Sequence, residues 1–440
     1  MSKVAFYTLG CKVNQYETEA MSEIFENSGY DIVEFSEKAD VYIINTCTVT
    51  GLSARKSRQM IRRAKAVNGK AIVAVVGCYP QTSPDEVTGI PDVDIIIGTR
   101  ERGKILEYID SVRTQGGKVN AVSNIMKNSS FEELRIDRYK GRTRAFIKIQ
   151  DGCSQFCSYC IIPYARGPVR SRPPEDILAE VVKLAESGFK EVVLTGIHIA
   201  SYGKELTEIN LLELIKKIHR VEGISRIRLG SIEPSTITAE FAAAAGNLEK
   251  LCPHYHISLQ SGCNETLKRM NRKYTAEEYG NVIRLLRDNV RDVAFTTDVM
   301  VGFPGETEEE FEKTYRFLEE ISFAQMHVFK FSPRKGTPAA SMPGQVASEI
   351  KEARSERVLK LSTDNLLKFN RMHTGRNMPV LFEQEVKTMK GFYEGLTSNY
   401  IRVLCRGNDS IKGRIIGTDL VEAKDDYMLG EIKETALPGL

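Results

Sequence analysis

Short apolar runs alternate with stretches of helical periodicity along the first 120 residues. The apolar runs have the length and composition of strands buried in a sheet, and they occupy residues 3–10, 40–46, 70–77 and 93–98. Between them, apolar side chains recur with helical spacing, as in residues 14–29 and 53–69. Because strand–helix alternation is typical of parallel sheets with helices on their faces, we predict a Rossmann-like parallel α/β domain over residues 1–120.

The same alternation returns over a longer span, between residues 139 and 370. Six apolar runs are separated by helical stretches such as residues 174–188, 275–289 and 306–321. The six runs are residues 145–151, 191–196, 226–231, 255–260, 293–302 and 325–331. Six β/α units form an incomplete version of the eight-unit barrel, so we predict a partial (β/α)6 TIM-type barrel whose working face lies at the strands' carboxyl ends.

Two further stretches complete the predicted organisation. Residues 111–144 are rich in Ser, Asn, Gly and Arg, and we interpret them as a linker followed by a basic strand that leads into the barrel. After a basic helix near residues 350–371, the helical period disappears, and short strands alternate with Gly and Asn turns. This pattern predicts a small β-barrel over residues 374–440, of a kind that often binds nucleic acid.

Charge is informative only locally, because the net charge of the whole chain is +3. Residues 51–84 carry seven Lys or Arg and no acid, and residues 135–148 carry six against Asp137 alone. These stretches form either solvated faces or a phosphate-binding surface.

The first residues lack the pattern of a signal peptide, no apolar run approaches the ~18 residues of a membrane helix, and we expect no membrane partner. Nine cysteines form no secreted disulfide framework, so we expect a cytoplasmic protein with reduced thiols.

Three cysteines lie on one short loop after the first predicted barrel strand. The loop reads DGCSQFCSYC and contains Cys153, Cys157 and Cys160. A closed zinc site requires four ligands, whereas three thiolates on a [4Fe–4S] cluster leave one iron able to bind a small molecule. A zinc ion with a distant fourth ligand and a purely structural cluster are the alternatives.

A second group of three cysteines follows three successive strands of the N-terminal domain. Cys11, Cys47 and Cys78 come directly after the first, second and third predicted strands. Ligands of open α/β sheets bind outside the carboxyl ends of the strands, so the three thiols can converge on one point. The alternative is that they are buried small side chains, since Cys is among the most buried residue types.

The loop C-x3-C-x2-C, with Tyr159 just before its last cysteine, resembles the signature of radical S-adenosylmethionine (SAM) enzymes. The stretch GCSQFCSYCIIPYARGPVRSR, with an α/β domain before it and a small β-barrel after it, resembles the methylthiotransferases of that superfamily over nearly the whole chain. The resemblance implies two [4Fe–4S] clusters, one on the radical SAM loop (Cys153, Cys157, Cys160) and an auxiliary one on Cys11, Cys47 and Cys78. It also implies SAM as methyl donor and radical source, and a C-terminal TRAM domain that contacts RNA.

The stretch TLGCKVNQYETE, residues 8–19, resembles the group that acts on tRNA bearing N6-threonylcarbamoyladenosine. This resemblance implies conversion of that nucleoside, at position 37 in the anticodon stem-loop, to its 2-methylthio derivative by sulfur insertion at adenine C2 and methyl transfer. The alternatives are isopentenyladenosine of tRNA or an aspartate of a ribosomal protein as substrate, and a metal-stabilised RNA-binding protein without catalysis. An electron donor such as flavodoxin or ferredoxin is expected for this chemistry.

Further site residues follow from strand ends and from the same resemblance. The residues expected to contact SAM are Tyr159, Gly196, Glu233, Ser258, Gln260, Arg269 and Asp298. The residues expected to contact RNA are Arg166, Arg170 and Arg172, after the cysteine loop, and Arg402 in the TRAM-like segment. The polar ones among them are equally compatible with structural pairing or with ordinary surface charge.

Overall fold

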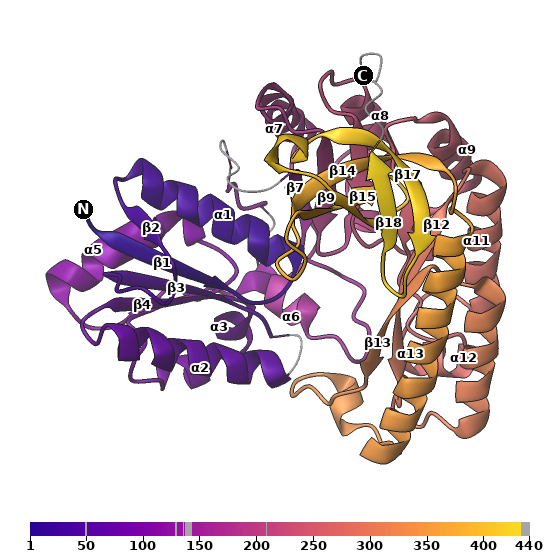
Figure 1. The fold of residues 1–440 in the computed structure, drawn as a ribbon. Helices are drawn as coiled ribbons and strands as arrows, with labels where there is room; N and C mark the ends of the chain where they lie inside the picture. The colour runs from indigo at the N-terminus through magenta and orange to yellow at the C-terminus, as the bar shows by residue number, and fades with distance from the viewer. Residues whose placement is uncertain (49–50, 128–129, 135, 137–142, 208, 433–440) are drawn as a thin grey trace.

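The computed structural model describes residues 1–48, 51–127, 130–134, 136, 143–207 and 209–432. Three parts follow one another along the chain (Figure 1): an α/β layer, an open barrel flanked by helices, and a small closed barrel. The predicted start of the central domain at residue 139, half of the basic stretch 135–148 and residues 433–440 lie outside the described residues. Among the described residues, no helix has both the length and the apolar character needed to cross a bilayer.

The N-terminal sheet is parallel throughout, as predicted, with the order β2-β1-β3-β4-β5-β6. The strands are β1 (Lys3–Thr8), β2 (Asp31–Val33), β3 (Val41–Thr46), β4 (Ile72–Gly77), β5 (Ile95–Ile97) and β6 (Val119–Asn120). The helices are α1 (Lys12–Asn27), α2 (Gly51–Val67), α3 (Cys78–Thr82), α4 (Pro84–Thr88) and α5 (Ile105–Gln115). Apolar residues of α1 and α5 pack on one face of the sheet and those of α2 on the other, which accounts for the predominantly apolar character of β3 and β4.

Six parallel strands form the central part in sequence order, which confirms the partial barrel. They are β7 (Arg144–Asp151), β9 (Glu191–Gly196), β10 (Arg226–Leu229), β11 (His254–His256), β12 (Ala294–Val301) and β13 (Gln325–Lys330). Two sheets, β10-β9-β7-β8 and β11-β12-β13, are joined by isolated bridges between the segments around β10 and β11. The short antiparallel β8 (Arg170–Ser171) covers the outer edge of β7 and was not predicted.

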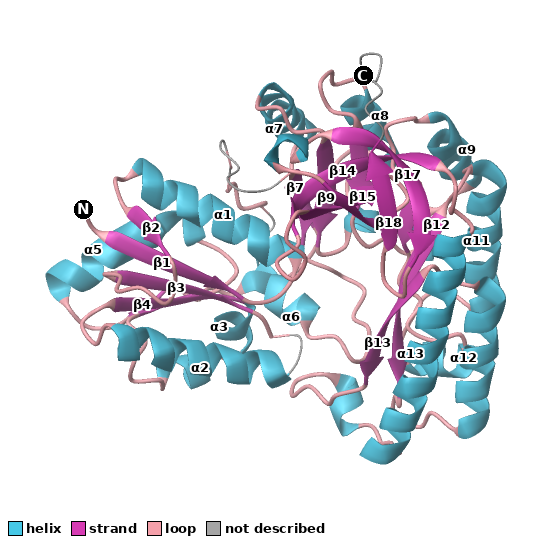
Figure 2. Cartoon of the chain, viewed as in Figure 1, coloured by secondary structure: helices cyan, strands magenta, loops and turns pink. Residues whose placement is uncertain are grey.

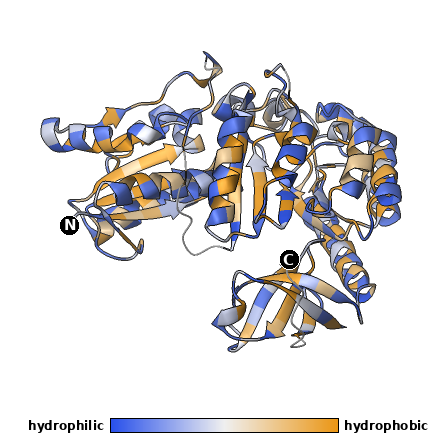
Figure 3. Ribbon diagram, turned by 90° about the horizontal axis from the view of Figure 1, so that it is seen from above, coloured by the Kyte–Doolittle hydropathy of each residue, from blue (hydrophilic) through white to orange (hydrophobic). Residues whose placement is uncertain are grey.

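Helices lie along the outer side of this open barrel (Figure 2), and their ribbons carry both hydrophilic and hydrophobic residues (Figure 3). They are α6 (Ile162–Arg166), α7 (Pro174–Glu186), α8 (Leu211–His219), α9 (Ala239–Asn247), α10 (Asn264–Arg269), α11 (Ala276–Asn289), α12 (Glu308–Ile321) and α13 (Ser348–Arg371). Short 3-10 turns are η1 (Arg102–Lys104), η2 (Ile125–Lys127), η3 (Ile199–Ser201), η4 (Pro234–Thr236), η5 (Pro338–Ser341) and η6 (Asp409–Ile411). Capping boxes begin α11 at Thr275–Glu278 and α12 at Thr307–Glu310, because each pair satisfies backbone N–H groups that the first turn leaves free.

The C-terminal part is a closed barrel of five strands in the order β14-β15-β16-β18-β17, consistent with a TRAM-like domain. The strands are β14 (Asn377–Glu385), β15 (Phe392–Thr397), β16 (Arg402–Arg406), β17 (Ile415–Ala423) and β18 (Met428–Ile432). This barrel is attached to the central one through buried arginines of β10. Arg226 donates to the carbonyls of Pro379 and Leu396, and Arg228 donates to those of Thr397 and Ser398.

Candidate active site

The first three cysteines lie at the carboxyl ends of adjacent strands. Cys11 caps α1 just after β1, Cys47 follows β3, and Cys78 is the first residue of α3, directly after β4. Burial, assisted by the nearby Cys11 and Cys47 thiols, raises the pKa of the Cys78 thiol to about 12, although the Arg166 guanidinium opposes this shift. The structure therefore brings the three predicted thiols together, and none of the three forms a disulfide bond.

Glycine at position 10 makes this convergence of thiols feasible. Gly10 has φ +113°, and a Cβ there would lie 2.9 Å from Asn14 Nδ2 and 3.0 Å from Cys47 Cβ. Any other residue would be strained and would displace the neighbouring side chains. Asn14 is held in turn by hydrogen bonds from its Nδ2 to the carbonyls of Leu9 and Thr46, at 2.7 and 3.0 Å.

The second group of cysteines lies on the loop that leaves β7. Gly152 begins the loop at φ +77°, where a Cβ would lie 1.8 Å from the carbonyl oxygen of Pro168. Burial raises the pKa of Cys153 to about 11 and that of Cys160 to about 12, and the nearby Cys157 contributes to both. These buried thiols are neutral in the absence of metal, and a metal would bind them with release of protons.

Thiolates are ligands of both zinc ions and iron–sulfur clusters. Within the described part of the chain, no three His, Cys, Asp or Glu side chains surround a point where a single metal ion would bind. A [4Fe–4S] cluster binds each thiolate through a different iron, so its ligands lie farther apart than those of one ion. Each group of cysteines offers the three thiolates that would leave one iron of a [4Fe–4S] cluster without a protein ligand.

A buried polar network surrounds the cysteine loop at the mouth of the barrel. The Arg272 guanidinium donates to Cys157 Sγ at 3.5 Å and pairs with Glu233 at 3.1 Å. Glu233 also lies 2.9 Å from His198 Nε2 and accepts from Gln155 at 3.2 Å. Burial opposes ionisation of Glu233, but His198 and Arg272 together hold its pKa below the usual value. The predicted Glu233 is thus at the site.

Two members of this network, Arg272 and His198, were missed by the sequence analysis. Arg272 lies in KRMNRKYT, the stretch from which Arg269 was selected instead. Arg269 points elsewhere and pairs with Glu310 of α12 through two hydrogen bonds, at 2.9 and 2.5 Å. Nothing in the local sequence distinguishes the two arginines, because the partners of Arg272 come from the segment after β10 and from the cysteine loop, and the partner of Arg269 comes from α12.

The other predicted SAM contacts lie at the barrel's strand ends. Tyr159 is partly buried against Phe303, and a Cβ on Gly196 would lie 2.9 Å from the carbonyl oxygen of Gln150. Gln260 adopts φ +69° and joins β11 to β12, with its N–H donating to the Asp298 carbonyl at 2.8 Å.

Ser258 and Asp298, two further predicted SAM contacts, meet their neighbours through different atoms: Ser258 through its backbone carbonyl and Asp298 through its side chain. The Ser258 carbonyl accepts from Arg272 at 3.2 Å, whereas the Asp298 carboxylate lies 3.4 Å from His256 Nε2. Ser258 therefore belongs to the network around the cysteine loop, and Asp298 faces the interior of the barrel.

The arginines after the cysteine loop are buried, which contradicts the prediction that they contact RNA. Arg166, Arg170 and Arg172 are at most 3% exposed. Arg172 pairs with Glu180, and Arg170 donates to the Arg166 carbonyl at 2.8 Å. Guanidinium groups with buried partners are not available to phosphates. Arg402 is different, because its side chain is 38% exposed, although it pairs with Glu394 and Asp426.

Arg166 instead connects the two groups of cysteines. Its Nε donates to Cys78 Sγ at 3.3 Å, and its Nη1 pairs with Glu17 of α1 at 2.5 Å. Lys148 of β7 bridges Glu17, at 2.8 Å, and Asp151, at 2.7 Å, two residues before Cys153. One buried ionic network thus fixes both cysteine loops relative to each other.

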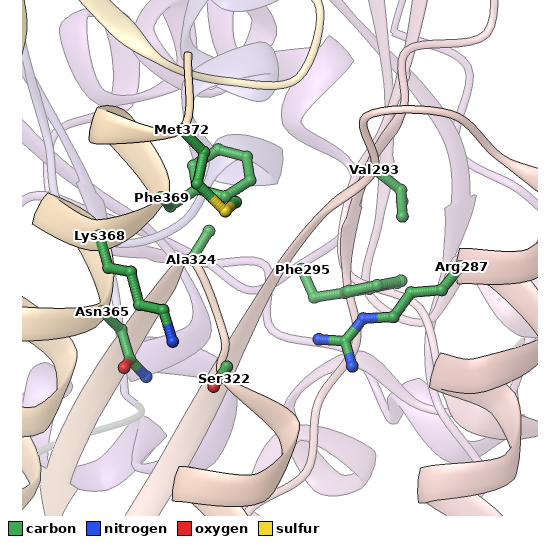
Figure 4. Close-up of a pocket in the computed structure, with 9 residues that line it drawn as sticks. All are labelled: Arg287, Val293, Phe295, Ser322, Ala324, Asn365, Lys368, Phe369 and Met372. Atoms are coloured by element: carbon green, nitrogen blue, oxygen red, sulfur yellow. The ribbon is translucent and has the colours of Figure 1, made fainter. Parts of the chain in front are cut away.

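Three cavities lie at different places relative to the two groups of cysteines. A cavity of about 740 Å³ opens between α2, α3, α6 and the loop after β13, and its lining includes Arg58, Tyr164, Arg334 and Lys335. A smaller one, about 230 Å³, lies inside the barrel. The pocket in Figure 4 lies near the amino ends of β12 and β13, around Phe295 and Ala324, and therefore on the side opposite to the cysteine loop.

Comparisons with known proteins agree with this geometry. A model of the radical SAM superfamily matches residues 147–318, and a model described as uncharacterized protein family UPF0004 matches residues 3–98. The fold resembles that of the radical S-adenosylmethionine methyltransferase TsrM from Kitasatospora setae, with a TM-score of 0.55 and 16% identity, covering 77% of this chain and 75% of that one. The structural likeness shows the fold, and the first family model defines the class: a protein with a radical SAM domain.

Comparison with curated relatives identifies the family to which the chain belongs within this class. The chain is 44% identical to the threonylcarbamoyladenosine tRNA methylthiotransferase MtaB of Bacillus subtilis, over 98% of this chain and 96% of that protein. It is 38% identical to the protein of the same name from Aquifex aeolicus, over 94% of this chain and 99% of that protein. A tRNA-2-methylthio-N(6)-dimethylallyladenosine synthase from Pelotomaculum thermopropionicum is 36% identical, over 98% and 97%. The chain belongs to the radical SAM tRNA methylthiotransferase family.

Proposed function

We propose that this protein methylthiolates N6-threonylcarbamoyladenosine at position 37 of tRNA, at adenine C2. The observation that carries the proposal is the 44% identity to a relative named for that nucleoside, over nearly the full length of both chains. The two converging groups of cysteines support it, because each has the three thiols that leave one cluster iron open. We also propose domain boundaries at residues 1–120, 139–370 and 374–440.

The two groups of cysteines are the residues that would bind the two clusters. Cys153, Cys157 and Cys160 would hold the radical SAM cluster, and Cys11, Cys47 and Cys78 would hold the auxiliary cluster. When bound, the clusters and SAM supply the radical that abstracts a hydrogen no ordinary base removes, together with the sulfur and the methyl group.

The protein's own residues position these groups and keep water away. Arg272 donates to Cys157 Sγ while Glu233 fixes the guanidinium, so the cysteine loop has one orientation. Arg166 does the same for Cys78, with its charge balanced by Glu17. Hydrogen bonds of this kind orient cluster ligands and adjust the reduction potential.

The tRNA would approach through the 740 Å³ cavity between the N-terminal sheet and the barrel. Arg334, Lys335 and the 44%-exposed Tyr164 line it, whereas Arg58, which also lines it, pairs with Glu86 at 2.7 Å. Positive charge and aromatic surface suit an anticodon loop, whose target base leaves its stack to react. Arg402 would add a contact from the C-terminal barrel. A flavodoxin or ferredoxin would supply electrons in the cytoplasm.

The proposal is tested by an anaerobic reaction of the reconstituted protein with SAM and dithionite. Three substrates are compared: tRNA carrying N6-threonylcarbamoyladenosine, tRNA carrying isopentenyladenosine, and the aspartate-bearing ribosomal protein. Mass spectrometry of the digests should find the methylthio group on the first alone. Its appearance only on either of the others would overturn the substrate assignment, and 5′-deoxyadenosine should be absent with a Cys157→Ala variant.

A further inference from the structure

A cavity of about 230 Å³ lies inside the barrel where all three parts of the chain meet, and we name it the central cavity. Lys12 of α1 enters it from the N-terminal domain, and Tyr400 enters it from the C-terminal barrel. The strands contribute His254 and His256 from β11, Asp298 from β12 and His327 from β13. The lining is polar, although the outer faces of the same strands form the apolar core.

Lys12 is the cation of this cavity that has no acidic partner. Among the described residues it forms no ion pair, and its ammonium lies 5.9 Å from the Phe146 ring. The other cation, Arg228, is already occupied by Glu191, at 2.7 and 3.3 Å, and by two carbonyls of the C-terminal barrel. A ligand anion would therefore meet Lys12 rather than Arg228.

The imidazole of His254 provides hydrogen-bonding capacity that the protein itself does not use. His254 is 5% exposed, and its Nδ1 has no hydrogen-bond partner in the structure, while its ring stacks on Tyr400 at 4.3 Å. A buried polar atom without a partner costs roughly 1–3 kcal/mol, so its retention indicates a ligand. Asp298 is the acid that faces the cavity, and it lies 3.4 Å from His256 Nε2.

The central cavity lies within reach of the proposed auxiliary cluster. Lys12 directly follows Cys11, and consecutive Cα atoms are about 3.8 Å apart. In adenine, N6 and C2 belong to the same ring, so a substituent on N6 extends only a short distance from the carbon that reacts. A base held with C2 beside the cysteines can therefore place its N6 substituent beside Lys12.

We propose that the central cavity binds the carboxylate of the N6-threonylcarbamoyl group, with Lys12 and His254 as the groups that recognise it. The inference rests on the proposed function and deepens it, since it names the part of the substrate that this cavity selects. Asp298 accepts from the hydroxyl or urea N–H of the same substituent. A dimethylallyl group offers none of these partners and would leave Lys12 and His254 desolvated, so the cavity rejects it.

Equilibrium binding tests this assignment without depending on turnover. Three labelled anticodon stem-loops are compared under anaerobic conditions, carrying the threonylcarbamoyl group, its neutral carboxamide, or dimethylallyl. The wild-type protein should bind the carboxylate about tenfold more tightly than the carboxamide. Lys12→Met keeps the length of the side chain and removes its charge, and His254→Phe keeps the stacked ring and removes its nitrogens. Each should reduce the ratio to about twofold or less while leaving carboxamide binding unchanged.

The control variant is Lys335→Met, which removes a positive charge outside the central cavity. It should leave the carboxylate-to-carboxamide ratio as in the wild type, and iron content should match in all samples because Lys12 adjoins Cys11. Equal wild-type binding of carboxylate and carboxamide, or an equal loss of both with Lys12→Met, would overturn the assignment. If the wild type forms the methylthio product yet shows no such ratio, only the cavity assignment fails. If no product forms on this RNA, the proposed function itself fails.

Discussion

Replacing Glu17 by Gln removes the carboxylate around which the N-terminal sheet and the barrel meet. Glu17 is fully buried and contacts Arg102, Lys148 and Arg166. Burial opposes its ionisation, but the three cations outweigh this effect and lower its pKa from 4.5 to about 2. At 1.36 kcal/mol per pKa unit, the difference corresponds to about 3 kcal/mol of stability. Breaking a buried ion pair from one side costs a similar ~3–5 kcal/mol.

The dependence on pH follows from the direction of this shift. The folded-state pKa of Glu17 is depressed, so its contribution is fully present above the unfolded pKa near 4.5 and is lost as the pH falls through 2. The stability difference between wild type and Glu17→Gln should therefore be about 3 kcal/mol near pH 7 and should shrink between pH 4.5 and 2.

The assay is urea unfolding of the cluster-free protein, followed by circular dichroism because the chain has no tryptophan. The control is Glu240→Gln, which removes a 74%-exposed partner of Lys216 and should cost less than about 1 kcal/mol. A loss with Glu17→Gln no larger than that of the control, or a difference that stays constant down to pH 2, would refute the buried network as the source of stability.

Three further changes test the site. Gly10→Ala places a Cβ at 2.9–3.0 Å from neighbouring side chains and should lower stability by about 1–3 kcal/mol in thermal unfolding, more than Gly29→Ala, which also has positive φ but open space around it. Arg272→Met removes the donor to a cluster cysteine and should slow 5′-deoxyadenosine formation about 10–100-fold, with an unchanged rate as the contrary result. If Arg402 contacts phosphate, Arg402→Met should reduce the salt slope of RNA binding by about 0.7, whereas the buried Arg172→Met should leave it unaltered; equal slopes in both variants would argue against that contact.

The sequence predicted the fold well wherever an element is long and periodic. The six barrel strands and the helices α7, α11 and α12 appear within a few residues of their predicted positions, because their apolar pattern directly reflects burial. The strands β2, β6 and β8 were missed, since two or three residues at a sheet edge carry no period.

The candidate site was predicted unevenly for a different physical reason. Cysteines after strands were identifiable because strand ends converge in a parallel sheet. The role of Arg166 was not, because its partners Glu17 and Cys78 are 149 and 88 residues away, and only folding shows that its charge is buried. Arg272 was not predicted for the same reason, because its partners Cys157 and Glu233 are distant from it in the sequence.

If each group of three cysteines holds a cluster, the iron content of the protein reports both clusters at once. Anaerobically reconstituted protein should contain about eight irons per chain, with Mössbauer spectra of [4Fe–4S] type. Replacing Cys11, Cys47 and Cys78 together by Ala should leave about four, as should replacing Cys153, Cys157 and Cys160. A wild-type protein with only about four irons, or an iron content unchanged by the first replacement, would contradict the account.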